Sequence, residues 1–214
     1  YNYINKNDAI KLCYENIEHY GVKELLIDYL KNENKIDEVI RILKDDVKNH
    51  IRKDMAYDKL LNIYDENNMK EEKKKLLPEV TIETSSFKRY KELKDMCDKL
   101  EWNNIKEGII SNIKPNNKWF LEDIYMEENE IDKLFNLLKK NPSISKLARY
   151  QNCVKEKYSK ELLNFYKPQI LEESKRVSDR KWYQELCVYI GKMSELNDSD
   201  DFIFEMLKEM YPNY

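Results

Sequence analysis

The chain has 214 residues, of which 37% are charged, and it contains only three glycines and five prolines. All-β and doubly wound α/β folds need many tight turns, so this shortage of turn formers argues against both classes. The net charge of −3 predicts no global affinity for nucleic acid. Sixteen tyrosines and three tryptophans supply ample apolar area for a folded core, which argues against disorder.

The first predicted helix begins at a cap provided by Asn7 or Asp8. Gly21 is placed to end this helix as a left-handed C-terminal residue. Two antiparallel helix pairs follow, with turns at residues 32–34 and 66–68. We expect Pro78 to end the second pair, because proline cannot continue a helix. The four helices of these pairs are predicted over residues 22–31, 36–47, 51–64 and 70–77.

Residues 81–86 form the one stretch rich in Thr and Ser. This composition favours a loop, in which Ser85 or Ser86 caps the next helix. A single helical-repeat domain is expected over residues 1–214, and the 81–86 loop is its best candidate boundary, between subregions 1–80 and 86–214. The next helices are predicted over 87–100 and 105–113, with Trp102 in the turn between them and Pro115 after the second.

The C-terminal part is predicted to hold further short helices. Ser159 is expected to open one of them, and Pro168 is placed to start another. Asp200 or Asp201 fits the cap of the last helix better than a calcium ligand, since the string lacks the glycine and glutamate of a calcium loop. The predicted helices cover residues 119–125, 131–140, 147–157, 160–166, 169–176, 179–193 and 200–210.

A helical phrase recurs along the chain. Residues 25–44 and 120–139 each contain an apolar helix, a short polar turn that includes Asn, and a second apolar helix that opens with Ile-Asp. A fainter copy occupies residues 60–77. A unit of two short helices repeated in this way is typical of a stacked helical array. The predicted fold is therefore all-α, an array of antiparallel helix pairs that forms a tetratricopeptide-like α-solenoid with a right-handed superhelix by analogy with related repeats.

No residue set specifies a reaction. The two histidines, His19 and His50, lie in different helical units, and no Cys-x-x-Cys or His-x-x-x-His pattern occurs, so neither catalytic nor metal-binding residues are predicted. Glycine-rich phosphate loops are also absent, so no cofactor is expected. Acid pairs such as Glu127-Glu128 lie at expected turns, where no pocket desolvates a carboxylate. We therefore expect a protein that is not an enzyme.

The charge distribution is less even than its sum. Residues 121–138 carry six acids and one lysine, whereas residues 139–181 carry twelve Lys or Arg and five acids. This basic segment includes several tyrosines, and basic residues interleaved with aromatics can stack on single-stranded bases or grip peptides. Solvated helix faces and tyrosines packed between helices produce the same pattern. The candidate nucleic-acid or partner contacts are Arg149, Lys157, Lys167, Arg176, Arg180 and Lys181.

The four cysteines, Cys13, Cys97, Cys153 and Cys187, are far apart and have apolar neighbours at helical spacing. Buried free thiols of this kind behave as small hydrophobes and fit a reducing cytoplasm. No apolar run is long enough to span a membrane, and the first residues show no secretory signal. The chain begins without Met, which suggests an excerpt of a longer protein.

The last part of the chain resembles a known family. The resemblance rests on Ile-Tyr-x-x-Glu-Asn-x-Ile at residues 124–131, Tyr-Ser-Lys-Glu-Leu-Leu-Asn-Phe-Tyr at 158–166, and Arg-Lys-Trp-Tyr at 180–183. Cys-Val-Tyr-Ile-Gly-Lys-Met at 187–193 follows. This order is similar to the C-terminal helical region of SWIM zinc-finger proteins, in which a tetratricopeptide-like array follows a small Cys/His zinc module. That module is absent here, so the resemblance implies no metal ligand.

These features together predict a non-catalytic scaffold for protein–protein interaction. Its partner would be another protein, or an adjoining domain of the parent chain, lying in the groove formed by the first helices of successive pairs. The alternative is an accessory nucleic-acid-binding region that uses the basic segment 139–181.

Overall fold

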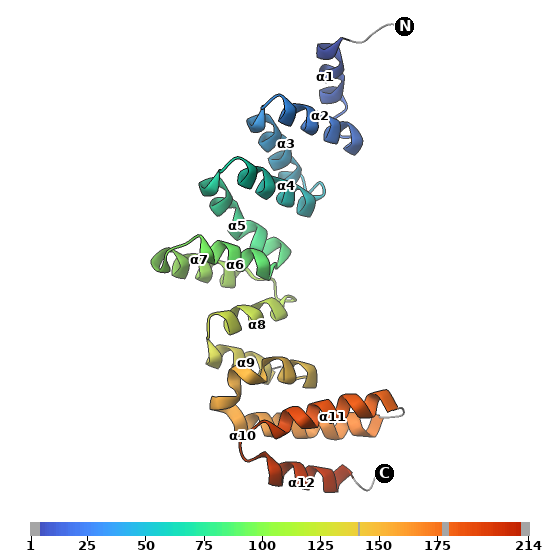
Figure 1. Cartoon of the computed structure of the whole chain (residues 1–214), viewed down its shortest axis with the longest axis vertical. Helices are drawn as coiled ribbons and strands as arrows, with labels where there is room; N and C mark the ends of the chain where they lie inside the picture. Colours follow the sequence, from blue (N-terminus) through green and yellow to red (C-terminus); the bar gives the residue numbers. More distant parts are fainter. Residues whose placement is uncertain (1–4, 141, 177–179, 211–214) are drawn as a thin grey trace. The chain divides into compact units, whose positions relative to one another are not determined.

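The computed structural model describes residues 5–140, 142–176 and 180–210. Within these residues the chain forms twelve helices and no strand, which confirms the predicted all-α class (Figure 1). Contacts divide the chain into two compact units, Tyr1–Lys114 and Pro115–Tyr214. We call them unit 1 and unit 2 and describe each by itself.

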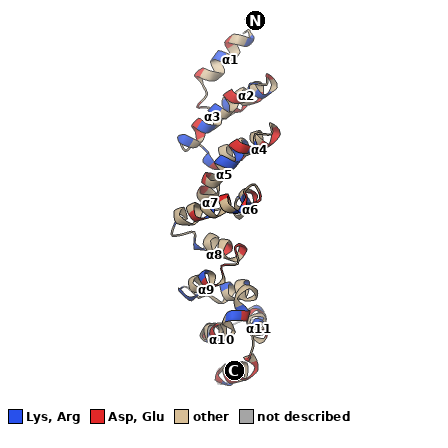
Figure 2. Ribbon diagram, turned by 90° about the vertical axis from the view of Figure 1, so that its left-hand side faces the viewer, with Lys and Arg blue, Asp and Glu red and all other residues tan. Residues whose placement is uncertain are grey.

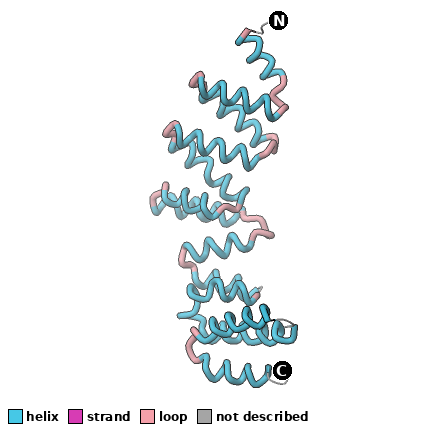
Figure 3. Tube along the Cα trace, turned by 45° about the vertical axis from the view of Figure 1, so that its right-hand side comes forward, coloured by secondary structure: helices cyan, strands magenta, loops and turns pink. Residues whose placement is uncertain are grey.

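Unit 1 is a succession of short helices, and in each pair the second helix folds back on the first (Figures 1 and 3). Its main contacts join helices that are neighbours in the chain, together with α5 and α7. The helices are α1 (Lys6–Glu15), α2 (Tyr20–Asn32), α3 (Ile36–Lys48), α4 (Lys53–Glu66), α5 (Lys70–Thr84), α6 (Phe87–Asp95) and α7 (Lys99–Asn112).

Unit 2 begins with a similar pair and continues with longer helices. Its third helix bends at Tyr158, whose backbone angles of φ −126° and ψ 29° are not helical. The last three helices contact one another in all combinations. The helices are α8 (Lys118–Glu127), α9 (Ile131–Lys140), α10 (Ile144–Arg176), α11 (Arg180–Ser194) and α12 (Ser199–Met210).

The repeated phrase has a structural basis in its turn. Asn34, Asn68 and Asn129 follow α2, α4 and α8, and each adopts the left-handed conformation, with φ of 55–57°. The residue after each Asn donates its backbone N–H to a carbonyl five residues earlier, at 2.8–2.9 Å. This arrangement is the Schellman motif, in which the left-handed residue is usually Gly and sometimes Asn. The pairs α2–α3, α4–α5 and α8–α9 are therefore the three copies of the phrase.

The second helices of these pairs share a buried position. Leu43, Leu77 and Leu138 occupy it, and all three are at most 1% exposed. One turn earlier, α3 and α9 bury Val39 and Leu134, whereas α5 has Lys73 there. Lys73 is only 7% exposed and forms ion pairs with Asp65 and Glu92, each at 2.5 Å. This charged replacement explains why the middle copy is faint in the sequence.

Two helix ends in unit 1 differ from the prediction. Gly21 does not end the first helix: α1 ends at Glu15, because Asn16 bonds the Leu12 carbonyl through its side-chain amide at 2.9 Å, and Gly21 lies in the first turn of α2. The cap of α1 is Asn5, whose side chain accepts the Asp8 N–H at 2.9 Å.

Pro78 does not end α5 either. The helix continues to Thr84, because Val80 and Thr81 beyond the proline are buried and outweigh its lost hydrogen bond. Residues 81–84, expected in a loop, are thus helical, and Ser86 caps α6 as predicted. The contacts divide the chain after Lys114, whereas the sequence favoured a boundary at residues 81–86.

Trp102 was expected in a turn but lies in α7, 6% exposed and edge-on to Tyr90, with ring centroids 4.9 Å apart. The predicted helix over 87–100 ends early, at Asp95. Asp98 then caps α7 by accepting two backbone N–H groups at 2.9 Å, so Trp102 follows a helix start that the prediction missed.

The helix starts predicted in unit 2 have different outcomes. The non-helical backbone at Tyr158 separates two helical stretches, and the second begins at Ser159 as predicted. Pro168 opens no helix, because the second stretch continues through it. The Ser159 hydroxyl also accepts the Asn197 N–H at 2.8 Å. Asp200 and Asp201 lie in the first turn of α12 rather than at its cap, a place where the helix dipole favours acids.

The thiols are less buried than predicted. Cys13, Cys97 and Cys153 are partly buried, and Cys187 is exposed on α11, away from the apolar face that carries Leu186 and Met193. All four are free thiols.

Candidate functional site

The predicted contact residues all lie on α10 and α11, but three of them already have acidic partners. Arg149 binds Asp123 at 2.8 Å and Lys157 binds Asp132 at 2.5 Å. Lys167 forms an ion pair with Glu209 of α12. The structure thus brings these three cations to carboxylates of the same unit rather than to one another.

The other three candidates lie at the far end of α10 and the start of α11. Arg176 is the last residue of α10, and its side chain lies outside the described residues. Arg180 and Lys181 open α11 and are exposed. The two groups of candidates occupy different stretches of unit 2.

The acidic and basic segments that the sequence shows as separate blocks face each other in the fold. Glu122 and Asp123 of α8 are 3% and 5% exposed, and they pair with Lys146 at 2.6 Å and with Arg149. Asp123 also accepts the hydroxyl of the buried Tyr150 at 2.9 Å. Figure 2 shows acidic and basic residues interspersed along the helices. Four cations of the basic segment, Lys146, Arg149, Lys157 and Lys167, therefore have acidic partners.

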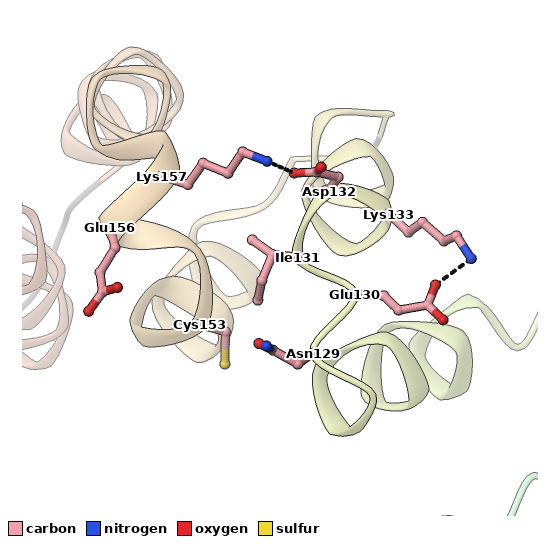
Figure 4. A pocket seen from close by; sticks show the side chains of 8 residues that line it. All are labelled: Asn129, Glu130, Ile131, Asp132, Lys133, Cys153, Glu156 and Lys157. Carbon is pink, nitrogen blue, oxygen red and sulfur yellow. Dashed lines mark hydrogen bonds and ion pairs between the residues drawn. The ribbon is translucent and has the colours of Figure 1, made fainter. Parts of the chain in front are cut away.

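One hollow lies in unit 2, between the α8–α9 turn and α10 (Figure 4). Its volume is about 590 Å³. Two ion pairs border it, Lys157 with Asp132 and Lys133 with Glu130. The lining residues are Asn129, Glu130, Ile131, Asp132, Lys133, Cys153, Glu156 and Lys157.

Two groups in this hollow, Asp132 and Cys153, have shifted pKa values that favour their ordinary charge states. Hydrogen bonds from Lys157 and Tyr158 lower the pKa of Asp132, so this carboxylate stays ionised at neutral pH. Burial raises the pKa of the Cys153 thiol, which disfavours the thiolate. A general base would need a raised carboxyl pKa and a nucleophile a lowered thiol pKa. The hollow suits polar contacts better than acid–base or nucleophilic chemistry.

A smaller hollow of about 160 Å³ lies in unit 1, between α2, the end of α3 and the start of α4. Its floor includes an ion pair between the buried residues Lys23 and Asp46. Three large apolar side chains at its edge are exposed: Tyr20 by 41%, Ile51 by 46% and Met55 by 44%. Apolar side chains thus gather around a small polar floor, between the first helices of two successive pairs.

The connection that carries part of this hollow is strained. His50 and Arg52 both adopt the left-handed conformation, with φ of 55° and 45°. Arg52 lies over the Tyr20 ring, 3.8 Å from its centroid. Residues other than Gly, Asn and Asp rarely adopt this conformation, and where they do the fold must hold them there. The contact between Arg52 and Tyr20 joins α2 to the start of α4 and fixes one edge of the hollow.

Sequence reasoning missed this second hollow. The sequence predicts helices that include Tyr20, Ile51 and Met55. Nothing in the spacing of these residues indicates that they are exposed together. The only available signal was the polar run Lys-Asn-His at residues 48–50, which marks the end of a helix.

The residues that the structure describes contain no group of three or more His, Cys, Asp or Glu able to hold a metal ion. His19 and His50 are exposed at helix ends. Among the same residues, no helix combines the length and apolarity needed to span a membrane. Comparison with known proteins found no matching family model, no matching curated protein and no matching solved structure.

Proposed function

We propose that this chain is a non-catalytic scaffold for protein–protein interaction, built from tetratricopeptide-like helix pairs within a larger protein. The observation that carries the proposal is the hollow between α2 and α4. Exposed apolar side chains that gather at one place on a surface are typical of sites that receive another protein. A peptide side chain of apolar character would fit among Tyr20, Ile51 and Met55.

The ion pairs of unit 1 support a preformed surface. Glu24 pairs with Lys59 between α2 and α4, and Asp58 pairs with Arg89 between α4 and α6, at 2.9 Å. These contacts hold the first helices of successive pairs together before any partner arrives. A preorganised surface loses less entropy on binding than a mobile one.

Accessory nucleic-acid binding through residues 139–181 has less support. Phosphate binding depends on cations that are free to replace counterions, and Arg149, Lys157 and Lys167 are paired with carboxylates. The proposal also includes a cytoplasmic location, because the four free thiols fit a reducing compartment. The resemblance to the helical region of SWIM zinc-finger proteins belongs to the same proposal.

The experiment is selection of binding peptides from a displayed library, followed by affinity measurement on variants. Met55→Glu places a charge at the edge of the hollow and is expected to weaken binding at least tenfold, since a charge would be desolvated against apolar side chains. Leu100→Glu is the matched control, because Leu100 is 77% exposed in unit 1 but lies on α7. Equal binding by both variants and the unchanged chain would contradict the proposed surface.

A fluorescence-anisotropy titration with short DNA and RNA tests the alternative. Binding that weakens steeply with salt, and that is lost in the Arg180→Glu/Lys181→Glu variant, would favour nucleic-acid binding as the function. We expect no such binding at physiological salt.

A further inference from the structure

The bend in α10 lies between the helices predicted over residues 147–157 and 160–166, and no proline causes it. Residues on both sides of Tyr158 are helical, and the helix spans 33 residues in all. Sharp bends in helices usually occur at proline, but Pro168 lies well beyond this one. Glu156, Lys157 and Lys160 are good helix formers. These residues would also allow an uninterrupted helix through Tyr158.

Contacts from other helices hold the bend instead. The Tyr158 ring stacks on Phe135 of α9, with centroids 3.8 Å apart, and its hydroxyl donates to Asp132 at 2.6 Å. Lys157 binds the same carboxylate at 2.5 Å. On the other side, Ser159 accepts the Asn197 N–H. We call Asp132 with Lys157 and Tyr158 the latch; it borders the large hollow of unit 2, where Asp132 and Lys157 are seen in Figure 4.

The bend folds two arms of the helix into one core. The first arm (residues 144–157) supplies Leu147, Tyr150 and Val154 to the buried cluster of unit 2, and the second arm (residues 159–176) supplies Leu162, Leu163, Tyr166 and Ile170. Polar groups of the two arms are also hydrogen-bonded. Gln151 accepts the Tyr166 hydroxyl at 2.8 Å and donates to the Lys192 carbonyl of α11 at 2.7 Å. This is a specific and fully paired interface within one chain.

We propose that α10 is a hinge at which two copies of this chain exchange their C-terminal segments. In the exchanged dimer α10 is straight at Tyr158, and the second arm with α11 and α12 packs on the first arm of the second copy. Every buried contact between the arms is then remade between copies. Only the contacts of Tyr158 with Asp132 and Phe135 are lost, because Tyr158 becomes helical. Asp132 and Lys157 both precede the bend, so their ion pair stays within one copy. Exchange of identical segments needs no new surface, which is why it is a low-cost route to dimers.

The latch is weak enough for this exchange. The contact that exchange breaks is the hydrogen bond from Tyr158 to Asp132, which is exposed to solvent. The Asp132 side chain is 60% exposed, and exposed charged contacts contribute little to stability. The latch favours the closed monomer at low concentration, and the dimer is favoured when protein is concentrated or the latch is removed.

The first test measures the monomer–dimer equilibrium by size exclusion with light scattering, after refolding over a range of concentrations. Asp132→Ala and Tyr158→Ala are each expected to raise the association constant about tenfold. The variant monomers have no latch, so forming a dimer no longer requires two latches to be broken. Glu205→Ala removes an equally exposed ion pair of unit 2, that between Glu205 and Lys208, and serves as the matched control. Monomeric latch variants, or equal dimerisation by the control, would overturn the proposal.

The second test separates exchange from association of two closed monomers. Val154→Asp damages the first arm and Leu162→Asp the second, and both residues are fully buried. When the two variants are unfolded together and refolded as a mixture, exchange builds one intact core from the undamaged arms. We expect a heterodimer with cooperative unfolding, which neither variant shows alone. A mixture that gains no such species, although the latch variants dimerise, would refute exchange.

Discussion

The two units differ in the charges that they bury. In unit 1 the buried charged residues are the lysines Lys23 and Lys73 and the acid Asp46, which pairs with Lys23. In unit 2 they are the acids Glu122 and Asp123, paired with the more exposed Lys146 and Arg149. The same two-helix phrase therefore tolerates either sign in its interior, provided that a partner of the other sign reaches it. What the units share is the turn and the apolar spacing, not the arrangement of charge.

The strongest test of this comparison uses the shared apolar position. Leu43→Ala, Leu77→Ala and Leu138→Ala should each lower the free energy of unfolding by about 3 kcal/mol, because each leaves a cavity in a closed core. Urea denaturation followed by circular dichroism measures the loss. Leu100→Ala, at an exposed position, should have little effect. A much smaller loss for one of the three would show that its helix pair is packed differently.

Removing a partner of a buried acid should have the next largest effect. Lys146→Ala leaves the Glu122 carboxylate buried without a cation, which should lower the free energy of unfolding by about 2–3 kcal/mol. Lys74→Ala in unit 1 is the comparison, because its partner Glu101 is 40% exposed and can be hydrated. Its loss should be clearly smaller. Equal losses in urea denaturation would remove the distinction between the units.

Alkaline pH should destabilise unit 2 through its buried tyrosines. Burial raises the pKa of Tyr150 and Tyr166, and Asp123 raises that of Tyr150 further. Folding stability that depends on these raised pKa values is fully present below pH about 10, where unfolded tyrosine keeps its proton, and falls as the pH rises above it. The loss at pH about 11 is roughly 1.4 kcal/mol for each tyrosine.

The Tyr150→Phe/Tyr166→Phe variant checks this prediction. Denaturation curves at pH 8 and at pH 11 should differ less for the variant than for the unchanged chain. At pH 8 the variant itself should be less stable, because Asp123 and Gln151 lose hydroxyl donors. An unchanged pH dependence would assign alkaline sensitivity to other groups.

The smallest expected effect concerns the shared turns. Asn34→Ala, Asn68→Ala and Asn129→Ala should each cost about 1 kcal/mol, since a left-handed backbone is unfavourable for alanine. The matching Asn→Gly variants should lose nothing, because glycine adopts this conformation freely. Thermal unfolding of the six variants measures the difference. Unequal costs in the two units would show that the turns are not equivalent.

The sequence predicted the helix pairs because their determinants are local. The apolar spacing around Leu43 and Leu138, and Asn34, Asn68 and Asn129 in the turns, act within a few residues of each other. The prediction at Pro78 was wrong because tertiary burial decided it, whereas those at Gly21 and Trp102 missed the local side-chain bonds of Asn16 and Asp98. Val80 and Thr81 are buried beyond Pro78, and Trp102 packs on Tyr90.

The candidate sites were less predictable for a related reason. Charge blocks at residues 121–138 and 139–181 look like separate surfaces in the sequence, but they pair across α8, α9 and α10. The hollow beside Tyr20 and Met55 depends on two left-handed residues, His50 and Arg52, that no turn signal marks. Pairing between distant helices and unusual backbone at non-glycine residues leave little trace in composition or spacing.

The contacts of unit 1 have a consequence for how it folds. Its main helix contacts join neighbours in the chain, and its ion pairs between helices, such as Glu24 with Lys59 and Lys74 with Glu101, link residues of successive pairs. Little loop closure has to precede these contacts, and chains with such low contact order fold quickly. Each helix pair can dock as soon as it leaves the ribosome, so unit 1 would be assembled in the order of its synthesis.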